Sequence, residues 1–174
     1  MSELILPNTK YIESVKKAHE EQFQHGEISK EVWDGILSDL SDPESYVRVI
    51  LDKSNGIGLK LNQVPVTRYW LIDGDEYIGT LGLRKEITIE ARNREGNIGY
   101  QIRPSKRGQG YGNVILKLGL QKAKEFGLEN IYINCSENNT ASKKIIENNG
   151  GELLSTSKDE VSGEKSLHYL IKII

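Results

Sequence analysis

The residues best suited to chemistry lie in a glycine-rich segment at 106–112, which reads Lys-Arg-Gly-Gln-Gly-Tyr-Gly. Before it, apolar and polar residues alternate from Ile98 to Ile102, which predicts a strand. Pro104 ends that strand, because proline has no N–H to give to a sheet. A helical pattern begins near Asn113. A glycine-rich turn that enters a helix directs several backbone N–H groups the same way, and the helix dipole adds partial positive charge. The segment, called the glycine loop below, therefore predicts a phosphate-binding site.

The glycine loop does not match other common phosphate-binding motifs. It is not Gly-x-Gly-x-x-Gly, so a dinucleotide-binding fold is disfavoured, and it lacks the Gly-Lys-Ser/Thr ending of a nucleotide P-loop. A Mg²⁺-dependent binder of nucleotide phosphates needs that Ser or Thr, so this class is disfavoured as well. A tight strand-to-helix turn without a ligand is the remaining alternative. Such a turn does not need three glycines and two flanking cations, which favours the phosphate site.

The loop also matches the pattern Gln/Arg-x-x-Gly-x-Gly/Ala through Arg107, Gly110 and Gly112. In this it resembles the GNAT superfamily of N-acetyltransferases. The resemblance implies that the loop binds the pyrophosphate of acetyl-CoA and that the preceding strand offers backbone groups to the pantetheine arm. The cofactor-binding residues that it implies are Tyr100, Gln101, Ile102, Arg107, Gly108, Gln109, Gly110, Tyr111, Gly112, Asn139 and Ser142.

Asn139 and Ser142 belong to a second motif, Asn-Thr-Ala-Ser, which follows a strand pattern that ends at Cys135. In the GNAT superfamily an Asn-x-x-Ser at this place contacts the pantetheine or phosphate part of the cofactor. Helix capping by Asn138 or Asn139 explains the same residues without a ligand, and both roles can hold together. The position of the motif after the glycine loop supports the resemblance.

The sequence departs from the family pattern where the chemistry takes place. Many members have a tyrosine seven residues after the asparagine, which protonates the leaving thiolate, and here that position is Ile146. Members that acetylate protein N-termini often have a glutamate where this chain has Asn134, and members that act on lysine often have one near Gly96. We interpret Glu95 as the candidate base, directly or through water, and Asn134 and Ser136 as water-orienting groups. The alternative is a surface carboxylate and two polar groups at a strand end.

Composition limits the class of protein. The 174 residues, 28% charged and 37% hydrophobic, predict one globular domain over 1–174. The net charge of −2 argues against general nucleic-acid binding. No apolar run approaches the roughly 20 residues of a membrane span, and the N-terminus lacks a signal-peptide pattern. A single cysteine, Cys135, fits a reducing cytoplasm, and its place in a strand favours a buried thiol. The three histidines give no metal-ligand spacing with it, so no metal is expected.

The remaining pattern predicts the elements that position these motifs. Strands are expected at 3–6, 64–72, 76–84, 98–102, 131–135, 152–156 and 166–174. Helices are expected from Asn8, around 32–40, from a capping box at Ser41 and Glu44, and at 113–126 and 137–149. Segment 54–62 reads as a loop, 85–96 as ambiguous and 157–165 as a polar turn. The order predicts an α/β (or α+β) domain with a mixed central sheet flanked by helices, which is also the GNAT order.

The resemblance implies an acetyl-CoA-dependent N-acetyltransferase of the cytoplasm. Its acceptor is expected to be a primary amine of a small molecule or peptide, and a homodimer stays open as an assembly. The competing hypothesis is a regulatory module that binds acetyl-CoA with little or no turnover, which the missing tyrosine favours. Nucleic acid and membrane are not expected as partners.

Overall fold

The computed structural model describes residues 1–61, 63–158 and 163–173. The strands are β1 (Glu3–Ile5), β2 (Thr67–Asp73), β3 (Glu76–Leu83), β4 (Ile98–Ile102), β5 (Asn130–Ser136), β6 (Glu152–Lys158) and β7 (Lys165–Lys172). The α-helices are α1 (Ile12–Gln24), α2 (Lys30–Leu40), α3 (Pro43–Ser54), α4 (Ile89–Arg94), α5 (Tyr111–Glu125) and α6 (Thr140–Asn148). Two 3₁₀ turns, η1 (Thr9–Tyr11) and η2 (Pro104–Lys106), precede α1 and the glycine loop. None of the helices described here is long and apolar enough to cross a membrane.

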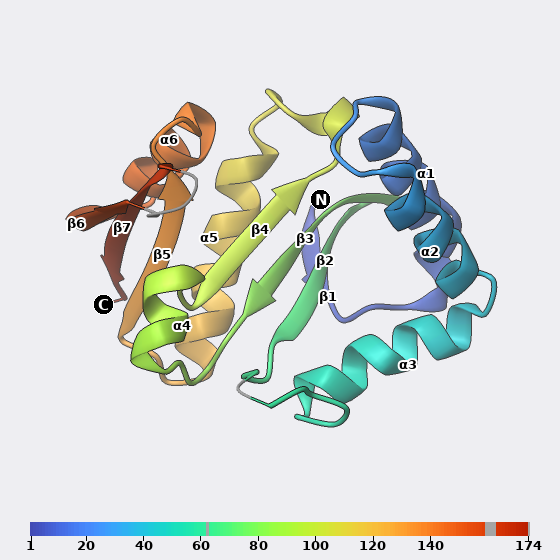
Figure 1. Ribbon diagram of the computed structural model, residues 1–174, viewed down its shortest axis with the longest axis horizontal. Helices are drawn as coiled ribbons and strands as arrows, with labels where there is room; N and C mark the ends of the chain where they lie inside the picture. Colours follow the sequence, from blue (N-terminus) through green and yellow to red (C-terminus); the bar gives the residue numbers. More distant parts are fainter. Residues whose placement is uncertain (62, 159–162, 174) are drawn as a thin grey trace.

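The strands form two antiparallel sheets, with the orders β1-β2-β3-β4 and β5-β7-β6. The predicted α+β class is confirmed, but the expected single mixed sheet is divided between β4 and β5. Within the described residues, backbone pairing between these two strands is limited to the segment at Gly96 and Asn97, where Asn97 N donates to Tyr132 O at 2.6 Å. Figure 1 shows the two strands diverging from there. Both strands therefore present free edges to the space between them.

Helices cover both faces of the first sheet. One core lies under α5 and α6 and includes Leu71, Leu81, Ile115 and Ile133. A second core, around Trp70, lies under α1, α2 and α3. Alternation along β2 sends successive side chains to opposite faces, which is why this strand serves both cores. Figure 1 shows α1, α2 and α3 together at one end of the molecule, with α5 along the back of the sheet.

Two predicted starts are wrong. Helix α3 is capped by Asp42, whose Oδ1 accepts from Ser45 N at 3.0 Å, rather than by Ser41. Ser41 instead donates from Oγ to Ser38 O at 2.6 Å and closes α2. Strand β2 begins at Thr67 rather than at residue 64. Pro65 lies among the residues that were predicted as strand but are outside β2, and proline has no N–H to donate to a neighbouring strand.

The elements around the motifs lie where the sequence predicts them, with shifted ends. Helix α5 begins two residues before Asn113, and α6 begins three residues after position 137 because Asn139 is its cap. The ambiguous segment 85–96 contains α4, whose cap Thr88 accepts from Ala91 N at 3.1 Å. Residues 62 and 174, and positions 159–162 of the predicted polar turn, lie outside the described residues.

Candidate functional site

The glycine loop joins β4 to α5 through two left-handed residues. Gly108 has a φ of 74° and Gly110, the cap of α5, has a φ of 87°, a region that suits glycine far better than other residues. No hydrogen-bond partner in the described chain accepts from the backbone N–H groups of residues 108–112. A Cβ at either glycine would meet no atom within 4 Å. The loop thus directs unpaired donors and the positive end of a 15-residue helix into open space, as an anionic group requires.

The start of α5 packs against the second half of α6, where Asn149 Nδ2 donates to Asn113 Oδ1 at 3.3 Å. A Cβ at Gly112 would lie 2.4 Å from Ile145 Cδ1, so the two helices approach closely here, and a larger residue would displace the Ile145 side chain. Asn139 Oδ1 accepts from Ser142 N at 2.9 Å and caps α6. The second motif therefore has the capping role at the start of α6.

Tyr100 and Ser142 meet across the divergence between β4 and β5. The two hydroxyl oxygens lie 3.1 Å apart, so residues from two separate motifs are brought into one site. Burial raises the pKa of the Tyr100 phenol, although its hydrogen bond with Ser142 acts in the opposite direction. Nearby Cys135 is buried, as predicted, and burial raises the pKa of its thiol. A protonated, buried thiol of this kind is a poor nucleophile.

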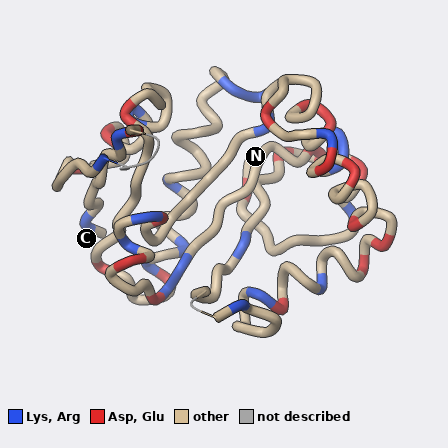
Figure 2. The backbone as a smooth tube through the Cα atoms, viewed as in Figure 1, with Lys and Arg blue, Asp and Glu red and all other residues tan. Residues whose placement is uncertain are grey.

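A carboxylate from α1 fixes the segment that leads into the glycine loop. Glu21 forms an ion pair with Arg103, whose side chain is only 7% exposed. It also accepts from Ser105 N at 3.1 Å and from Ser105 Oγ at 2.9 Å. Burial alone would raise the pKa of the Glu21 carboxyl, but the bonds from Arg103 and Ser105 outweigh burial and lower it to about 2. Figure 2 shows basic residues between β4 and α5 lying against acidic residues of α1.

The Arg107 guanidinium is already engaged by the protein. It forms an ion pair with Glu27, with Nη2 2.8 Å from Oε2, and its Nε donates to Ile102 O at 2.9 Å. Its side chain thus stabilises the loop from the α1 side, and the backbone N–H groups are the free donors. Sequence reasoning missed Glu21 and Glu27, because nothing local marks an ion pair between residues about 80 positions apart.

The candidate catalytic residues lie in different surroundings. Glu95, just after α4, forms an ion pair with Arg84 and has a 45% exposed side chain. Asn134 Nδ2 donates to two carbonyls at the end of α4, at 2.8 and 3.1 Å. Ser136 Oγ accepts from Asn138 N at 3.3 Å. The structure thus leaves Glu95 facing a cavity, while the Asn134 amide holds α4 against β5.

Ile146, at the position of the family tyrosine, is fully buried. It packs in the core under α6, where a Cβ at Gly151 would lie 2.4 Å from Ile146 Cγ2. The Ile146 side chain therefore contributes to core packing, and it has no proton to donate to a reacting group.

A polar chain that the sequence did not predict crosses the second sheet. His168 Nδ1 lies 3.0 Å from Asn134 Oδ1, and His168 Nε2 lies 2.8 Å from Ser157 Oγ. Because the Asn134 amide nitrogen is committed to α4, its Oδ1 must accept, which places the proton on Nδ1. Ser157 then donates to Nε2. Burial lowers the pKa of His168, and the charge of Arg92 lowers it further, so the ring is neutral near pH 7.

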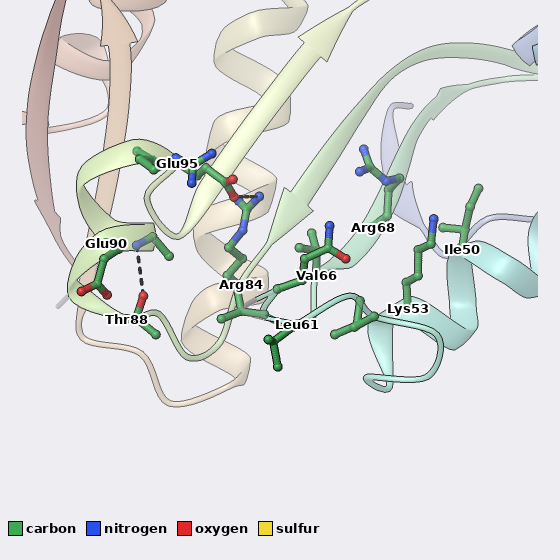
Figure 3. Close-up of a pocket in the computed structure, with 14 residues that line it drawn as sticks. Ile50, Lys53, Leu61, Val66, Arg68, Arg84, Thr88, Glu90 and Glu95 are labelled. Carbon is green, nitrogen blue, oxygen red and sulfur yellow. Dashed lines mark hydrogen bonds and ion pairs between the residues drawn. The ribbon is translucent and has the colours of Figure 1, made fainter. Parts of the chain in front are cut away.

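A cavity of about 990 Å³ opens beside Glu95. We call it the α3–α4 pocket; its walls are Ile50, Lys53, Leu59, Leu61, Gln63, Val64, Val66, Arg68, Arg84, Thr88, Glu90, Ala91, Arg94 and Glu95. Figure 3 shows Lys53 and Arg68 on the side of α3 and β2, with Arg84 and Glu95 opposite them toward α4. Of the residues that line the pocket, sequence reasoning identified Glu95 alone, because the others lie on elements that are separate in the sequence.

The pocket and the glycine loop lie at opposite ends of β4. Glu95 precedes the strand and the loop follows it, and the five residues of β4 alone span about 16 Å in extended conformation. The free edge of β4 connects the two. An elongated ligand with phosphates at one end and a reactive group at the other fits this layout.

Comparison with protein-family models gives one match over most of the chain. The model described as an acetyltransferase (GNAT) domain matches residues 16–152. No curated protein sequence gives a significant match.

Several solved structures share the fold. The microcin C7 self-immunity acetyltransferase MccE, in complex with acetyl-CoA and AMP, has a TM-score of 0.69 at 16% identity, over 99% of this chain and 92% of its own. The ribosomal L7/L12 α-N-protein acetyltransferase RimL, in complex with CoA, has a TM-score of 0.68 at 17% identity, over 99% and 94%. PaiA N-acetyltransferase from Thermoplasma acidophilum, in complex with CoA, has a TM-score of 0.62 at 14% identity, over 99% of both chains. At these identities the similarity is one of fold.

Proposed function

The chain belongs to the GNAT acetyltransferase family, whose domain covers residues 16–152, and from this premise we propose that it transfers an acetyl group from acetyl-CoA to a primary amine of a small molecule or peptide. The observation that carries the proposal is the glycine loop, with its free N–H groups at the start of α5 and open space before them. The CoA or acetyl-CoA in the MccE, RimL and PaiA structures supports the choice of donor.

The proposed binding mode uses both ends of β4. Backbone N–H groups at 108–112 hold the pyrophosphate, and the free edge of β4 from Tyr100 to Ile102 lies along the pantetheine arm. Asn139 and Ser142 border the same space from the start of α6. This arrangement directs the far end of the cofactor toward the α3–α4 pocket, which then receives the amine.

In the proposed reaction, the amine nitrogen attacks the thioester carbonyl of acetyl-CoA. The C–S bond then breaks, and CoA leaves as a thiolate that takes up a proton from water or from the amine. An amine with a pKa near 10 in water must lose a proton before it attacks, so a base helps at neutral pH. We assign that role to Glu95, directly or through a water, with Arg84 orienting its carboxylate. Asn134 and Ser136 border the site from β5, and an N–H on the β4 edge polarises the carbonyl. Proximity in one site supplies much of the remaining rate.

Acetyl-CoA is expected to stabilise the protein. A ligand that binds only the folded state at about 100 times its dissociation constant adds about 2.7 kcal/mol to the free energy of unfolding. A thermal melt with and without acetyl-CoA measures this, with titration calorimetry for the dissociation constant. No heat and no change in Tm at millimolar acetyl-CoA would contradict the proposed donor.

The competing function is a regulatory module that binds acetyl-CoA without turnover. The observation that favours it is the complete burial of Ile146, which leaves the usual position of the acid without a polar group. Release of the CoA thiol, assayed over a panel of amines, distinguishes the two. Amine-dependent release supports the transferase. Tight binding of acetyl-CoA without release on any amine supports the module.

A further inference from the structure

The α3–α4 pocket carries an excess of positive charge. Its walls hold four cationic side chains, from Lys53, Arg68, Arg84 and Arg94, against the two carboxylates of Glu90 and Glu95. The protein as a whole has a net charge of −2, so this excess is local. A cleft lined by one sign of charge raises the local concentration of oppositely charged ligands.

Both carboxylates already have partners within the wall. Glu95 pairs with Arg84. The Glu90 carboxylate is held by its own backbone N–H and then by the Thr88 hydroxyl, and these bonds lower its pKa. The described residues provide no ion-pair partner for Lys53, Arg68 or Arg94, which leaves these three charges for a ligand.

Lys53 and Arg68 are set on rigid elements, and Arg68 lies close to another charge of the same sign, Arg84. Lys53 is in the last turn of α3, and Arg68 is on β2 between two strands. Burial lowers the pKa of the Arg84 guanidinium, Glu95 raises it, and the charge of Arg68 lowers it again. An anion seated at Arg68 would relieve this repulsion. Guanidinium groups bind carboxylates and phosphates through paired hydrogen bonds, which suits both kinds of anion.

Charge and apolar surface alternate across the cavity. Figure 3 shows Val66 and Leu61 between the Lys53–Arg68 side and the Arg84–Glu95 side. A ligand that spans the pocket therefore meets Glu95 at one end, an apolar middle, and Lys53 and Arg68 at the other. The pocket also lies at the opposite end of β4 from the glycine loop, so these cations are not needed for the cofactor phosphates.

We propose that the acceptor amine carries an anionic group, a carboxylate or a phosphate, which Lys53 and Arg68 bind while Glu95 faces the amine. This inference rests on the proposed function, because it identifies the acceptor class of that reaction. Arg68 and Lys53 are then specificity-determining residues, and Arg94 adds charge at the rim.

Matched pairs of amines test the proposal. The probes are δ-aminovalerate with its amide and phosphoethanolamine with ethanolamine, which separate carboxylate from phosphate as the preferred anion. We expect kcat/KM for at least one anionic probe to exceed that of its neutral partner by about tenfold or more. Arg68→Gln and Lys53→Gln should each reduce this preference to within about threefold, through a higher KM, with an unchanged KM for acetyl-CoA. Arg48→Gln, which removes an exposed charge from α3 outside the pocket, should leave the preference unchanged.

Binding of the same probes, measured directly, tests the inference even if the protein shows no turnover. Titration calorimetry of each anionic probe should give binding to the wild type and at least about tenfold weaker binding to Arg68→Gln. Equal use of neutral and anionic amines, or no binding of either anionic probe, would overturn the inference. Acetyl-CoA binding is measured in the same samples, so turnover of neutral amines alone refutes the acceptor class, whereas absence of acetyl-CoA binding refutes the proposed function.

Discussion

Gly110→Asp is expected to weaken acetyl-CoA binding by at least about a hundredfold, equivalent to about 2.7 kcal/mol. The Cβ at this position points into open space at the start of α5, where the proposed pyrophosphate lies. An aspartate would fill that space and add a negative charge next to the phosphates. Aspartate at a φ of 87° is strained, at a cost of about 1–3 kcal/mol. No protein atom lies within 4 Å of the new Cβ, so the fold should persist. Titration calorimetry measures the loss.

Gly127→Asp is the matched control. Gly127 follows α5 at its other end, has a φ of 76°, and leaves a Cβ with no atom within 4 Å. Both variants therefore meet the same left-handed backbone and add the same charge, and only Gly110 lies in the glycine loop. Gly127→Asp should bind acetyl-CoA like the wild type. Wild-type affinity in Gly110→Asp would place the phosphates elsewhere.

Glu21→Ala is expected to destabilise the protein by about 3–5 kcal/mol, the range for breaking a buried ion pair from one side. Arg103 would keep a charge with 7% exposure and lose its carboxylate partner. Ser105 would lose both of its bonds to Glu21, so the entry to the glycine loop would loosen as well. Denaturant unfolding gives the free energy. Glu20→Ala, an exposed carboxylate on the same helix, should change it by less than about 0.5 kcal/mol.

Glu21 also predicts how the free energy of unfolding depends on pH. The pKa of Glu21 is about 2 in the folded protein against an ordinary value of 4.5, so the unfolded chain binds more protons between these values. Its stabilising contribution is complete above pH 4.5 and is lost as the pH falls toward 2. Glu21→Ala should therefore show a smaller loss of stability than the wild type over this window. Parallel curves for the two proteins would mean that the Glu21 pair does not hold the segment.

The glycine loop could be predicted from sequence because its signals are local. Glycine spacing, the proline before it and the periodicity after it all lie within some 15 residues, and backbone preferences act over that range. The same reasoning located Asn139, and the structure then added its bond to Ser142. The errors in the predicted elements lie at their ends. At the start of α3, for example, the neighbouring residues Ser41 and Asp42 are both able to cap the helix.

What the sequence could not predict depends on contacts between distant segments. The division of the sheet at β4 and β5 follows from strand pairing, which alternation does not encode. Glu21 meets Arg103 across 82 positions. The walls of the α3–α4 pocket come from α3, β2, α4 and the segments that connect these elements, so the cluster of charge around Arg68 appears only when the chain is folded.

Transfer of a labelled acetyl group tests the central claim most directly. The protein is incubated with acetyl-CoA carrying ¹³C in its acetyl group and with each amine of the panel, and the products are analysed by mass spectrometry and NMR. We expect the label on an amine nitrogen, in amounts that match the CoA thiol released, with Gly127→Asp active and Gly110→Asp inactive. Label that appears only as free acetate, or on no amine while acetyl-CoA binds, would contradict the account.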